Sequence, residues 1–526
     1  MKITSYIIWC SMLTGSAALV FSGFGQTASL IGKEVSTPVH LADGQENELS
    51  ISQLIAYGSR LFRAKWTIQE GAGRPASKGT ATGSSLSDPS AQLIFPHNFN
   101  RISGPDSNSC AGCHNEPFQG GGGDRVTNVF VLANRFDFAT FDSNDNTPLR
   151  GAVDELGQRV TLQTIGNERK TIGMNGSGYI ELLAREMTSD LQAIRNSLKL
   201  GQSRTLMSKG VSFGILKHAL NGTWDTTMAA GLPASSLVSA SADEPPSLLI
   251  LPFHQSGADV SLRQFTNDAF TQHFGIQSEE RVGVGEDKDQ DGFVNELTRA
   301  DVTAATLYQA SLPVPGRIIS DDPEVEHAVR NGERLFGQIG CSICHIPSLP
   351  LSGRKAIYSE PGPYNPPGNI QQGQVPPIDV DLSSAELPGP RIHPDENGTV
   401  WVEAFTDMKL HDITSGLSDP NREPLDENAA AGTDAFFAGN GRFLTRRLWG
   451  VGNSGPYMHH GDFTTMREAI VAHAGEALAT RLSFQALSDY DRDSIIEFLK
   501  TLQILPPSST SRVINRNGQP KYWPKM

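Results

Sequence analysis

Two copies of one short pattern constrain this chain of 526 residues more than any other feature of its sequence. They read Cys110-Ala-Gly-Cys113-His114 and Cys341-Ser-Ile-Cys344-His345. C-x-x-C-H is the attachment sequence of c-type haem. Each cysteine sulfur bonds to one vinyl group of the porphyrin, and the histidine that follows lies beneath the iron as its ligand. The sequence therefore predicts two covalently bound haem c groups, with His114 and His345 as iron ligands.

Other uses of these cysteines explain less of the pattern. A four-cysteine zinc site normally has its pairs about 15–20 residues apart, whereas these pairs lie in different halves of the chain. A thioredoxin-like C-x-x-C needs no histidine and usually occurs once. Two disulfides would be compatible with an exported protein, but they do not explain why a histidine follows both pairs.

Residues 1–25 have the pattern of a signal peptide. An apolar stretch from Ile3 to Phe24 follows the single charge of Lys2, and small residues precede the expected cleavage site at Gln26. An uncleaved anchor is the alternative, but Ser, Thr and Gly dilute this stretch. No later stretch is apolar for about 18 residues, so we expect a periplasmic mature chain that does not span the membrane. The formal net charge of −14 argues against nucleic acid as a partner.

A second repeat precedes the two motifs and indicates two related domains. Residues 58–62 read Gly-Ser-Arg-Leu-Phe and residues 332–336 read Gly-Glu-Arg-Leu-Phe, both on stretches with helical character. A small glycine inside a helix often marks close packing against another helix. We expect a mainly α protein with two cytochrome c-like haem domains, long irregular loop insertions and little β structure. The expected bounds are 50–315 for the first domain, 320–507 for the second and 508–526 for a tail.

Element boundaries follow from caps, prolines and alternation. Asp322 and Pro323 are expected to open the helix that carries the second repeat. Two further helices are expected at 301–312 and 488–505, each stopped by a proline. Residues 399–405 alternate between apolar and polar side chains, which predicts a short strand.

The second half of the chain resembles a known family. Residues 448–461 (L-W-G-V-G-N-S-G-P-Y-M-H-H-G) and 464–470 (T-T-M-R-E-A-I) resemble the C-terminal signature of bacterial di-haem cytochrome c peroxidases. Trp449 is expected either between the haems, as a tryptophan is in those enzymes, or in the core. The resemblance is specific over about 320–505. Three segments are closer still to the longer relatives, the di-haem oxidoreductase family: 335–345, T-D-M-K-L-H-D-I at 406–413 and H-A-G-E-A at 473–477.

This resemblance implies two haems with different roles. In the peroxidases the N-terminal haem meets peroxide, whereas the C-terminal haem has two protein ligands and passes electrons. The second ligand there is a methionine 14 residues after a signature histidine, and counting from His459 gives His473. We therefore expect His473 to be the second ligand of the haem on His345, with a lower reduction potential than methionine would give. The competing residues are Met408, His411, Met458, His459 and His460.

The first haem needs a distal group if it activates peroxide. A carboxylate that moves a proton between the two peroxide oxygens is such a group, and the peroxidases use a glutamate. Residues 176–181 resemble the G-L-G-L-L-E segment of the longer relatives, so Glu181 is the expected catalytic residue and Glu186 the second choice. An ordinary helix glutamate is the alternative. Three histidines could instead close the distal side: His97, His218 and His254.

One acidic loop resembles the first part of an EF-hand. Asp287, Asp289 and Asp291 stand at positions 1, 3 and 5, and the carbonyl of Phe293 stands at position 7. A threonine replaces the glutamate of position 12, so Glu296 is the expected substitute. We expect Ca2+ here because three aspartates this close repel one another unless a cation neutralises them; an acidic turn is the alternative. The resemblance adds that the peroxidases hold calcium between their domains.

Together these features predict a di-haem oxidoreductase that reduces hydrogen peroxide, or another small oxidant, at the first haem. A small cytochrome c or a cupredoxin would supply electrons through the second haem. Two alternatives stay open: the haem pair could oxidise a protein or organic substrate through a high-valent haem, or the protein could be a non-enzymatic two-haem electron carrier. A homodimer is compatible with each of these functions.

Overall fold

The structure is a computed structural model in which residues 35–526 form one compact unit. The expected signal peptide at 1–25 lies outside the described residues. In the part of the chain that is described, no helix combines the length and the apolarity that a membrane span requires. The described residues are 31–72, 107–128, 167–239, 244–287, 292–352, 357–359, 364–366, 368–423, 426, 428–429 and 434–524.

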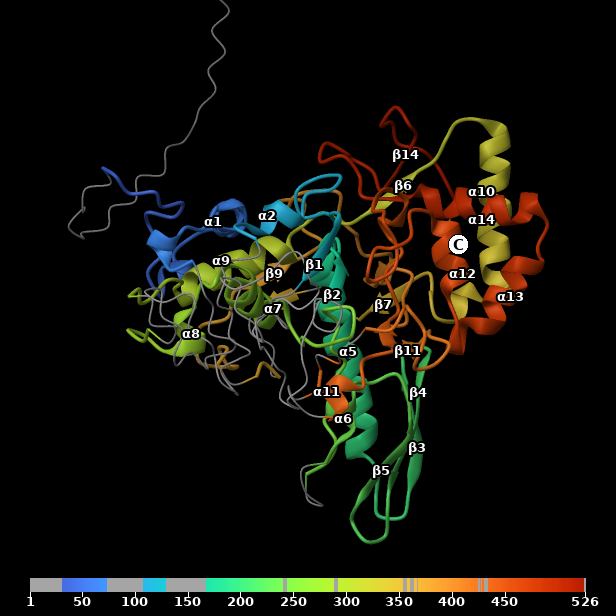
Figure 1. The fold of residues 1–526 in the computed structure, drawn as a ribbon, viewed down its shortest axis with the longest axis horizontal. Coiled ribbons are helices and arrows are strands. Elements are labelled where there is room, and N and C mark those ends of the chain that lie inside the picture. The colour runs from blue at the N-terminus through green and yellow to red at the C-terminus, as the bar shows by residue number, and fades with distance from the viewer. Residues whose placement is uncertain are drawn as a thin grey trace, which may run out of the picture. The chain divides into compact units, whose positions relative to one another are not determined.

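Two pairs of crossed helices frame the two haem motifs. α1 (Ile51–Arg63) packs on α9 (Arg299–Ala310), and α10 (Pro323–Gln338) packs on α14 (Asp489–Thr501). Figure 1 shows α1 and α9 together on one side, and α10 and α14 together on the other. The other described α-helices are α2 (Cys110–Cys113), α5 (Ser177–Asn196), α6 (Ala234–Leu237), α7 (Leu262–Ala269), α8 (Glu279–Val282), α11 (Asp434–Phe437), α12 (Met466–Ala472) and α13 (Leu478–Ala486).

A glycine lies at the crossing point of each pair. A Cβ added to Gly58 would lie 2.0 Å from the carbonyl oxygen of Ala304 in α9. A Cβ added to Gly332 would lie 2.0 Å from the carbonyl oxygen of Ser494 in α14. Neither separation leaves room for a side chain, since non-bonded carbon atoms rest about 3.5–4.0 Å from their neighbours. The prediction that these glycines mark close helix packing is confirmed, and the repeat in sequence is a repeat in packing.

Caps and strand pairing set the ends of the second helix pair. The Asp322 carboxylate accepts a backbone N–H of the first turn of α10 at 2.9 Å, and Pro323 is the first helical residue, as predicted. α14 ends at Thr501, earlier than predicted. The reason is that β13 (Leu502–Gln503) leaves the helix to pair antiparallel with β6 (Gly316–Ile318).

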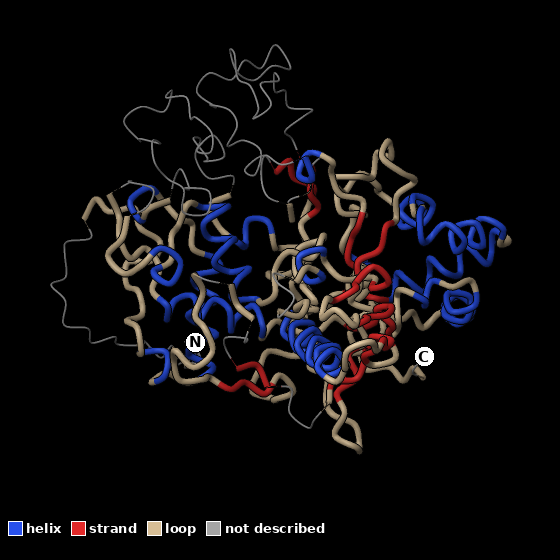
Figure 2. Tube along the Cα trace, turned by 90° about the horizontal axis from the view of Figure 1, so that it is seen from below, coloured by secondary structure: helices blue, strands red, loops and turns tan. Residues whose placement is uncertain are grey.

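The expectation of a mainly α protein with little β structure is wrong. Among the described residues only 34% are helical and 15% are in strands, and these strands form several separate sheets. Figure 2 shows these short strands, in red, running among the helices. Strands of two or three residues are too short to leave a period-two pattern in a sequence. The remaining strands are β1 (Arg125–Asn128), β2 (Asn167–Lys170), β3 (Ser203–Ser208), β4 (Val211–His218), β5 (Trp224–Ala229), β7 (Leu349–Leu351), β8 (Ile357–Ser359), β9 (Asp379–Asp381), β10 (Val400–Val402), β11 (Leu410–Asp412), β12 (Arg442–Leu444) and β14 (Val513–Ile514).

The antiparallel sheet β3-β4-β5 contributes most of this unexpected structure. Its first turn is Lys209-Gly210, with φ of 50° and 81°. Positive φ at both central residues is the conformation of a two-residue hairpin. Val211 and Phe213 face the core while Ser212 between them is exposed. The alternation of apolar and polar residues beside a glycine turn was therefore present in the sequence. By contrast, the strand predicted at 399–405 is confirmed as β10, which pairs with β7.

The C-terminal segment closes over α10 instead of extending away from it. Trp523 is 7% exposed and packs with Ile319 and Val329 in one apolar cluster. The guanidinium of Arg330 lies 4.0 Å from the centroid of the Trp523 ring, a cation–π contact. β14, in the same segment, pairs parallel with β6. Residues 508–524 therefore belong to the packing of the second half.

The substitution Gly332→Ala tests the helix contact. The added methyl group meets the Ser494 carbonyl, so α10 and α14 must separate. We expect the free energy of unfolding to fall by about 3 kcal/mol, the upper end of the usual overpacking cost. Urea denaturation followed by far-UV circular dichroism measures this change.

Gly337→Ala, in the same helix, is the matched control. Its Cβ would meet only the Ser342 hydroxyl, at 4.0 Å. Because alanine is a better helix former than glycine, this variant should gain about 0.5–1 kcal/mol. Equal losses in the two variants would contradict the packing explanation.

Candidate functional site

The fold brings the two haem motifs to one cavity of about 530 Å3. Its walls are apolar where Phe62, Phe270, Phe274 and Leu499 line it. Segments far apart in sequence thus share one interior space, as two electron-exchanging cofactors require. The motif residues that line this space are Cys110, Cys113, His114, Cys341, Cys344 and His345.

The cysteines of each pair lie on one helical turn. Cys110 and Cys113 are the ends of α2, and Cys341 begins a 3-10 turn that runs to Ile343. Residues three apart on a helical turn share a face, so both sulfurs of a pair can reach the edge of one porphyrin. None of the four motif cysteines is part of a disulfide. The disulfide alternative is therefore not what the structure shows.

The repeated phenylalanine packs beside each motif histidine. The ring centroids of Phe62 and His114 lie 6.3 Å apart at an interplanar angle of 49°. Those of Phe336 and His345 lie 6.4 Å apart at 51°. The last residue of the G-x-R-L-F repeat therefore contacts the motif histidine in the same way in both halves, which explains why repeat and motif occur together.

His345 and His473, the two histidines predicted to bind the second iron, are both neutral. The Nδ1 atom of His345 lies 3.1 Å from the Phe405 carbonyl oxygen, and that of His473 lies 2.7 Å from the Ala469 carbonyl oxygen. Donation from Nδ1 leaves the Nε2 lone pair for a metal. Burial, with a contribution from His473, lowers the pKa of His345 to about 4. Burial also lowers the pKa of His473, which ends α12 and lines the cavity.

His114 has a matching environment with one difference. Burial and the charge of His273 lower its pKa to about 4, although the carbonyls of Gly121 and Ile172 act in the opposite direction. Neither carbonyl meets the geometry of a hydrogen bond, so the Nδ1 atom of His114 is buried without a partner. A buried polar atom without a partner is costly, and a group that enters the cavity can reorganise this ring.

His273 is the residue that sequence reasoning missed. It lines the cavity and lies close enough to His114 to lower its pKa, as His473 does for His345. It belongs to a π-helical turn, Phe270–Phe274, that continues α7. Such turns are frequent at functional sites. No spacing rule connects His273 with the motif at His114, so only the tertiary structure reveals the pair.

The structure does not bring Glu181 or Glu186 to the cavity. Glu181 is fully buried in α5, where it pairs with Arg185 and accepts the backbone N–H of Leu262 at 2.8 Å. These contacts give it a structural role at the start of α7. Glu186 lies 2.5 Å from the Nζ atom of Lys209, on the sheet. The acid–base role of both glutamates stays a prediction that their positions do not favour.

Two of the residues that compete with His473 are engaged through both ring nitrogens. His411 lies 2.8 Å from an Asp407 oxygen through Nε2 and 2.7 Å from a Glu476 oxygen through Nδ1. His460 contacts Asn421 at 3.0 Å through Nε2 and accepts the Asp462 N–H at 2.9 Å through Nδ1. Neither ring has a nitrogen left for iron. Three other competitors line the cavity: Met408, Met458 and His459.

His411 is held as a cation beside the second motif. Burial alone would lower its pKa, but hydrogen bonds with Asp407, Cys344 and Glu476 raise it to about 10. One donor atom each from Cys344, Asp407 and His411 lie within 4.8 Å of one another, a spacing that could suit a metal ion. The motif assigns the Cys344 sulfur to haem attachment. His411 then remains as a cation that forms ion pairs with the carboxylates of Asp407 and Glu476.

The remaining tryptophan and histidine candidates differ in whether they line the cavity. Trp449 is buried against Gly176 and does not line the cavity among the described residues. Its contacts are those of core packing. His218 stacks on Trp224 at 4.1 Å in the β3-β4-β5 sheet, away from the cavity lining. His254 lines the cavity, with φ of 66°. His97 lies outside the described residues.

The expected calcium loop is described only in part. Asp289 and Asp291 lie outside the described residues. Asp287 accepts the backbone N–H of Gly292 at 3.0 Å, which closes the loop. Glu296 is buried and accepts the backbone N–H of Gln277 at 2.9 Å. Phe293 is half-buried. Calcium binding by these residues stays a prediction.

These observations fit a haem at each motif. Cysteines that form no disulfide lie on one face of a helical turn, neutral histidines line an apolar cavity, and the His114 ring has an unpaired nitrogen. In a bound state, Cys110, Cys113 and His114 would hold one group. The second would be held by Cys341, Cys344, His345 and His473.

Replacing one cysteine pair tests this assignment. Cys110→Ala/Cys113→Ala and Cys341→Ala/Cys344→Ala should each lose one of two covalently attached haems, because each pair serves one porphyrin. Intact-protein mass spectrometry under denaturing conditions counts them. Cys10→Ala, inside the expected signal peptide, is the control and should keep both. Two covalent haems in either double variant would refute the assignment.

The pH dependence of stability tests the His411 ion pair. A folded-state pKa of about 10, above the ordinary 6.5, means that folding favours the protonated ring. This stabilisation is complete below the unfolded pKa and is lost as pH rises through the folded pKa. Thermal melting should therefore show His411→Gln less stable than the wild type at pH 6, with the difference shrinking toward pH 10. A difference independent of pH would contradict the charged state.

Of three comparisons with known proteins, one supports an argument. Residues 384–502 match the model of a family described as "Di-haem oxidoreductase, putative peroxidase". No curated protein matches the chain. Hydrazine synthase of Kuenenia stuttgartiensis, solved under xenon pressure, is similar at 16% identity and a TM-score of 0.24, over 62% of this chain and 86% of that one. That TM-score is too low to support an argument. The family resemblance predicted from the signature is confirmed over residues 384–502, which are similar to this di-haem oxidoreductase family, whose name implies haem cofactors.

Proposed function

We propose that the protein is a periplasmic di-haem c-type oxidoreductase that reduces hydrogen peroxide at the first motif with electrons relayed through the second. The observation that carries this proposal is the shared cavity, in which His114 and His345 face a common interior. The pattern of residues 1–25 supports export. The donor would be a small cytochrome c or a cupredoxin, and a calcium ion at the loop that begins with Asp287 is part of the same proposal.

The two motifs are not equivalent in what surrounds them, and this supports the division of labour. His473 donates from Nδ1 to a backbone carbonyl and therefore directs Nε2 toward the second site. A second site with two histidine ligands suits electron transfer. When bound, haem would supply one-electron redox chemistry at each site.

The residues around the first site would handle the peroxide. His273 is a titratable group near His114, so it replaces Glu181 as our candidate for the acid–base that moves a proton between peroxide oxygens. The aromatic rings of Phe62, Phe270 and Phe274 would limit water in this part of the cavity. Gln309 also lines it and offers an amide for hydrogen bonding.

The stoichiometry of reoxidation tests this function. Reduction of H2O2 to two waters consumes two electrons and two protons, and each ferrous haem supplies one electron. Anaerobic titration of the fully reduced protein with H2O2 should therefore reoxidise both haems at one equivalent per protein. His473→Ala should slow reoxidation of the second haem, because its ligand set is broken. A reduced protein that stays reduced in excess peroxide would remove the peroxidase function.

A second function, that of a two-haem electron carrier, is favoured by one observation. His273 lies near His114, and a second histidine on that iron would leave no place for peroxide. The ferric spectrum separates the functions. A high-spin band that shifts with cyanide supports the enzyme, whereas two unreactive low-spin haems support the carrier. If His273→Ala converts a low-spin spectrum into one with a high-spin band that shifts with cyanide, His273 is the ligand that blocks the first haem.

A further inference from the structure

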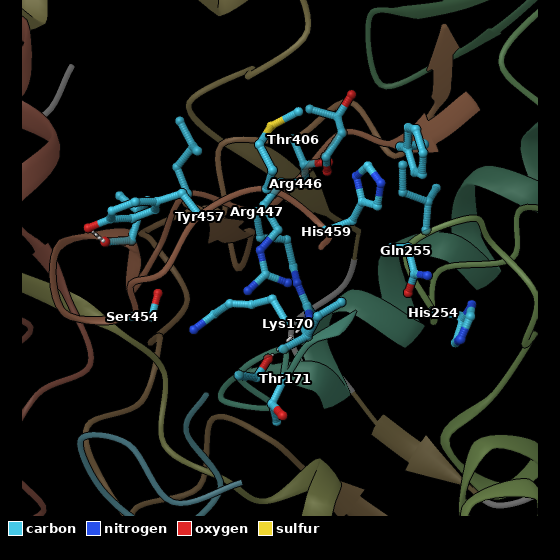
Figure 3. Close-up of a pocket in the computed structure, with 18 of the residues that line it drawn as sticks. Lys170, Thr171, His254, Gln255, Thr406, Arg446, Arg447, Ser454, Tyr457 and His459 are labelled. Atoms are coloured by element: carbon cyan, nitrogen blue, oxygen red, sulfur yellow. Dashed lines mark hydrogen bonds between the residues drawn. The ribbon is translucent and has the colours of Figure 1, made fainter. Parts of the chain in front are cut away.

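Three cations gather in the middle of the cavity. Figure 3 shows the labelled side chains of Lys170, Arg446 and Arg447 grouped in the centre of the view, with Tyr457 on one side and His459 on the other. Lys170 ends β2, and the two arginines follow β12 after one intervening residue, Thr445. The three therefore converge from the first and second halves of the chain, in the space that both motifs line.

None of the three has an ion-pair partner among the described residues. The Lys170 ammonium donates to the carbonyl oxygens of Gly123 at 2.7 Å and Gly455 at 2.9 Å. Arg447 donates from one Nη atom to the carbonyl of Gly173 at 3.3 Å, and its other Nη atom is buried without a partner. Glu116 and Asp124 act on Lys170 only from a distance.

Arg446 differs from the other two in its exposure, since Lys170 is buried and Arg447 half-buried. Its side chain has exposed surface, yet protein surrounds it, so that surface faces the cavity's interior. Burial lowers the pKa of Arg446 to about 10. Burial and the charge of Arg446 together lower the pKa of Arg447 to about 9 and that of Lys170 to about 8.

Like charges held this way in an enclosed space are unfavourable unless an anion joins them. Guanidinium groups bind carboxylates through paired N–H donors, and lysine adds a point charge. The unpaired Nη atom of Arg447 and the remaining proton of Lys170 are such donors. Each haem carries two propionate carboxylates, and the cluster lies in the cavity lined by both attachment motifs.

We propose that Lys170, Arg446 and Arg447 form a carboxylate receptor that binds propionate groups of the haems between the two sites. The cluster thereby compensates propionate charge, which raises the reduction potential of the haem that it contacts. Lys170 also ties the glycine loop after the first motif to the segment before Tyr457, so one receptor positions both sites. This inference rests on the haem assignment made above, but not on peroxide reduction.

Redox titration of cavity variants tests the receptor. Arg446→Gln, Arg447→Gln and Arg516→Gln are prepared as mature protein, checked by mass for two covalent haems and titrated anaerobically. Each cavity substitution should shift at least one midpoint potential downward, because a propionate loses its counter-charge. Arg516→Gln, which replaces an exposed arginine, should leave both potentials unchanged. Arg447→Lys keeps the charge and should restore most of the shift. Unchanged potentials in both cavity variants would overturn the proposal.

A second measurement needs no variant that might fail to mature. Resonance Raman bands of propionate bending in the wild type should move between H2O and D2O if the carboxylates accept exchangeable protons from these side chains. Bands that do not move would overturn the proposal. A soluble carboxylate is the other group that the same cluster could bind. Acetate that shifts the wild-type haem spectrum with saturation, but not that of Arg447→Gln, would assign the cluster to a soluble anion and overturn the propionate assignment. Neither readout involves peroxide turnover.

Discussion

Near-contact between the backbones of two helices is the constraint on which each haem motif depends. Gly58 and Gly332 let α1 and α10 approach α9 and α14 so closely that no side chain fits between them. Four residues later, a phenylalanine then reaches the histidine of the motif in both halves, at 6.3 Å and 6.4 Å. The position of each histidine is thus set by packing that begins one helix turn earlier. Moving either helix pair apart would displace the ring that is to bind iron.

Features that depend on a few neighbouring residues could be predicted from the sequence. The two C-x-x-C-H motifs, the glycine crossings and the cap at Asp322 each depend on neighbours within a few residues, so local chemistry identifies them. His473 was found by counting from a signature, and the structure places it in the cavity with His345. The family match at 384–502 covers the same part of the chain, which is where the resemblance was most specific.

Features made by tertiary contact could not be predicted in this way. His273 lies far in sequence from His114, and nothing in the surrounding residues indicates that the two side chains lie close enough to interact electrostatically. Glu181 shows the converse: its segment resembles a catalytic one, but folding commits its carboxylate to Arg185 and to the N-terminus of α7. The small sheets were missed because two- and three-residue strands depend on a partner strand more than on their own sequence. Only the β3-β4-β5 hairpins carried a signal that could have been recognised.

The C-terminal segment has a consequence for how the second half holds together. Trp523 covers Val329 and lies against Arg330, both on the helix that leads into the second motif. Its indole N–H donates to Glu333 at 2.9 Å, one residue after the crossing glycine. Proteolytic cleavage before Trp523 would therefore expose apolar surface on α10. It would also remove the hydrogen-bond partner of Glu333, which lies beside the contact between α10 and α14. The C-terminal segment therefore holds in place the helix that leads into Cys341, although this segment lies far from the second motif in sequence.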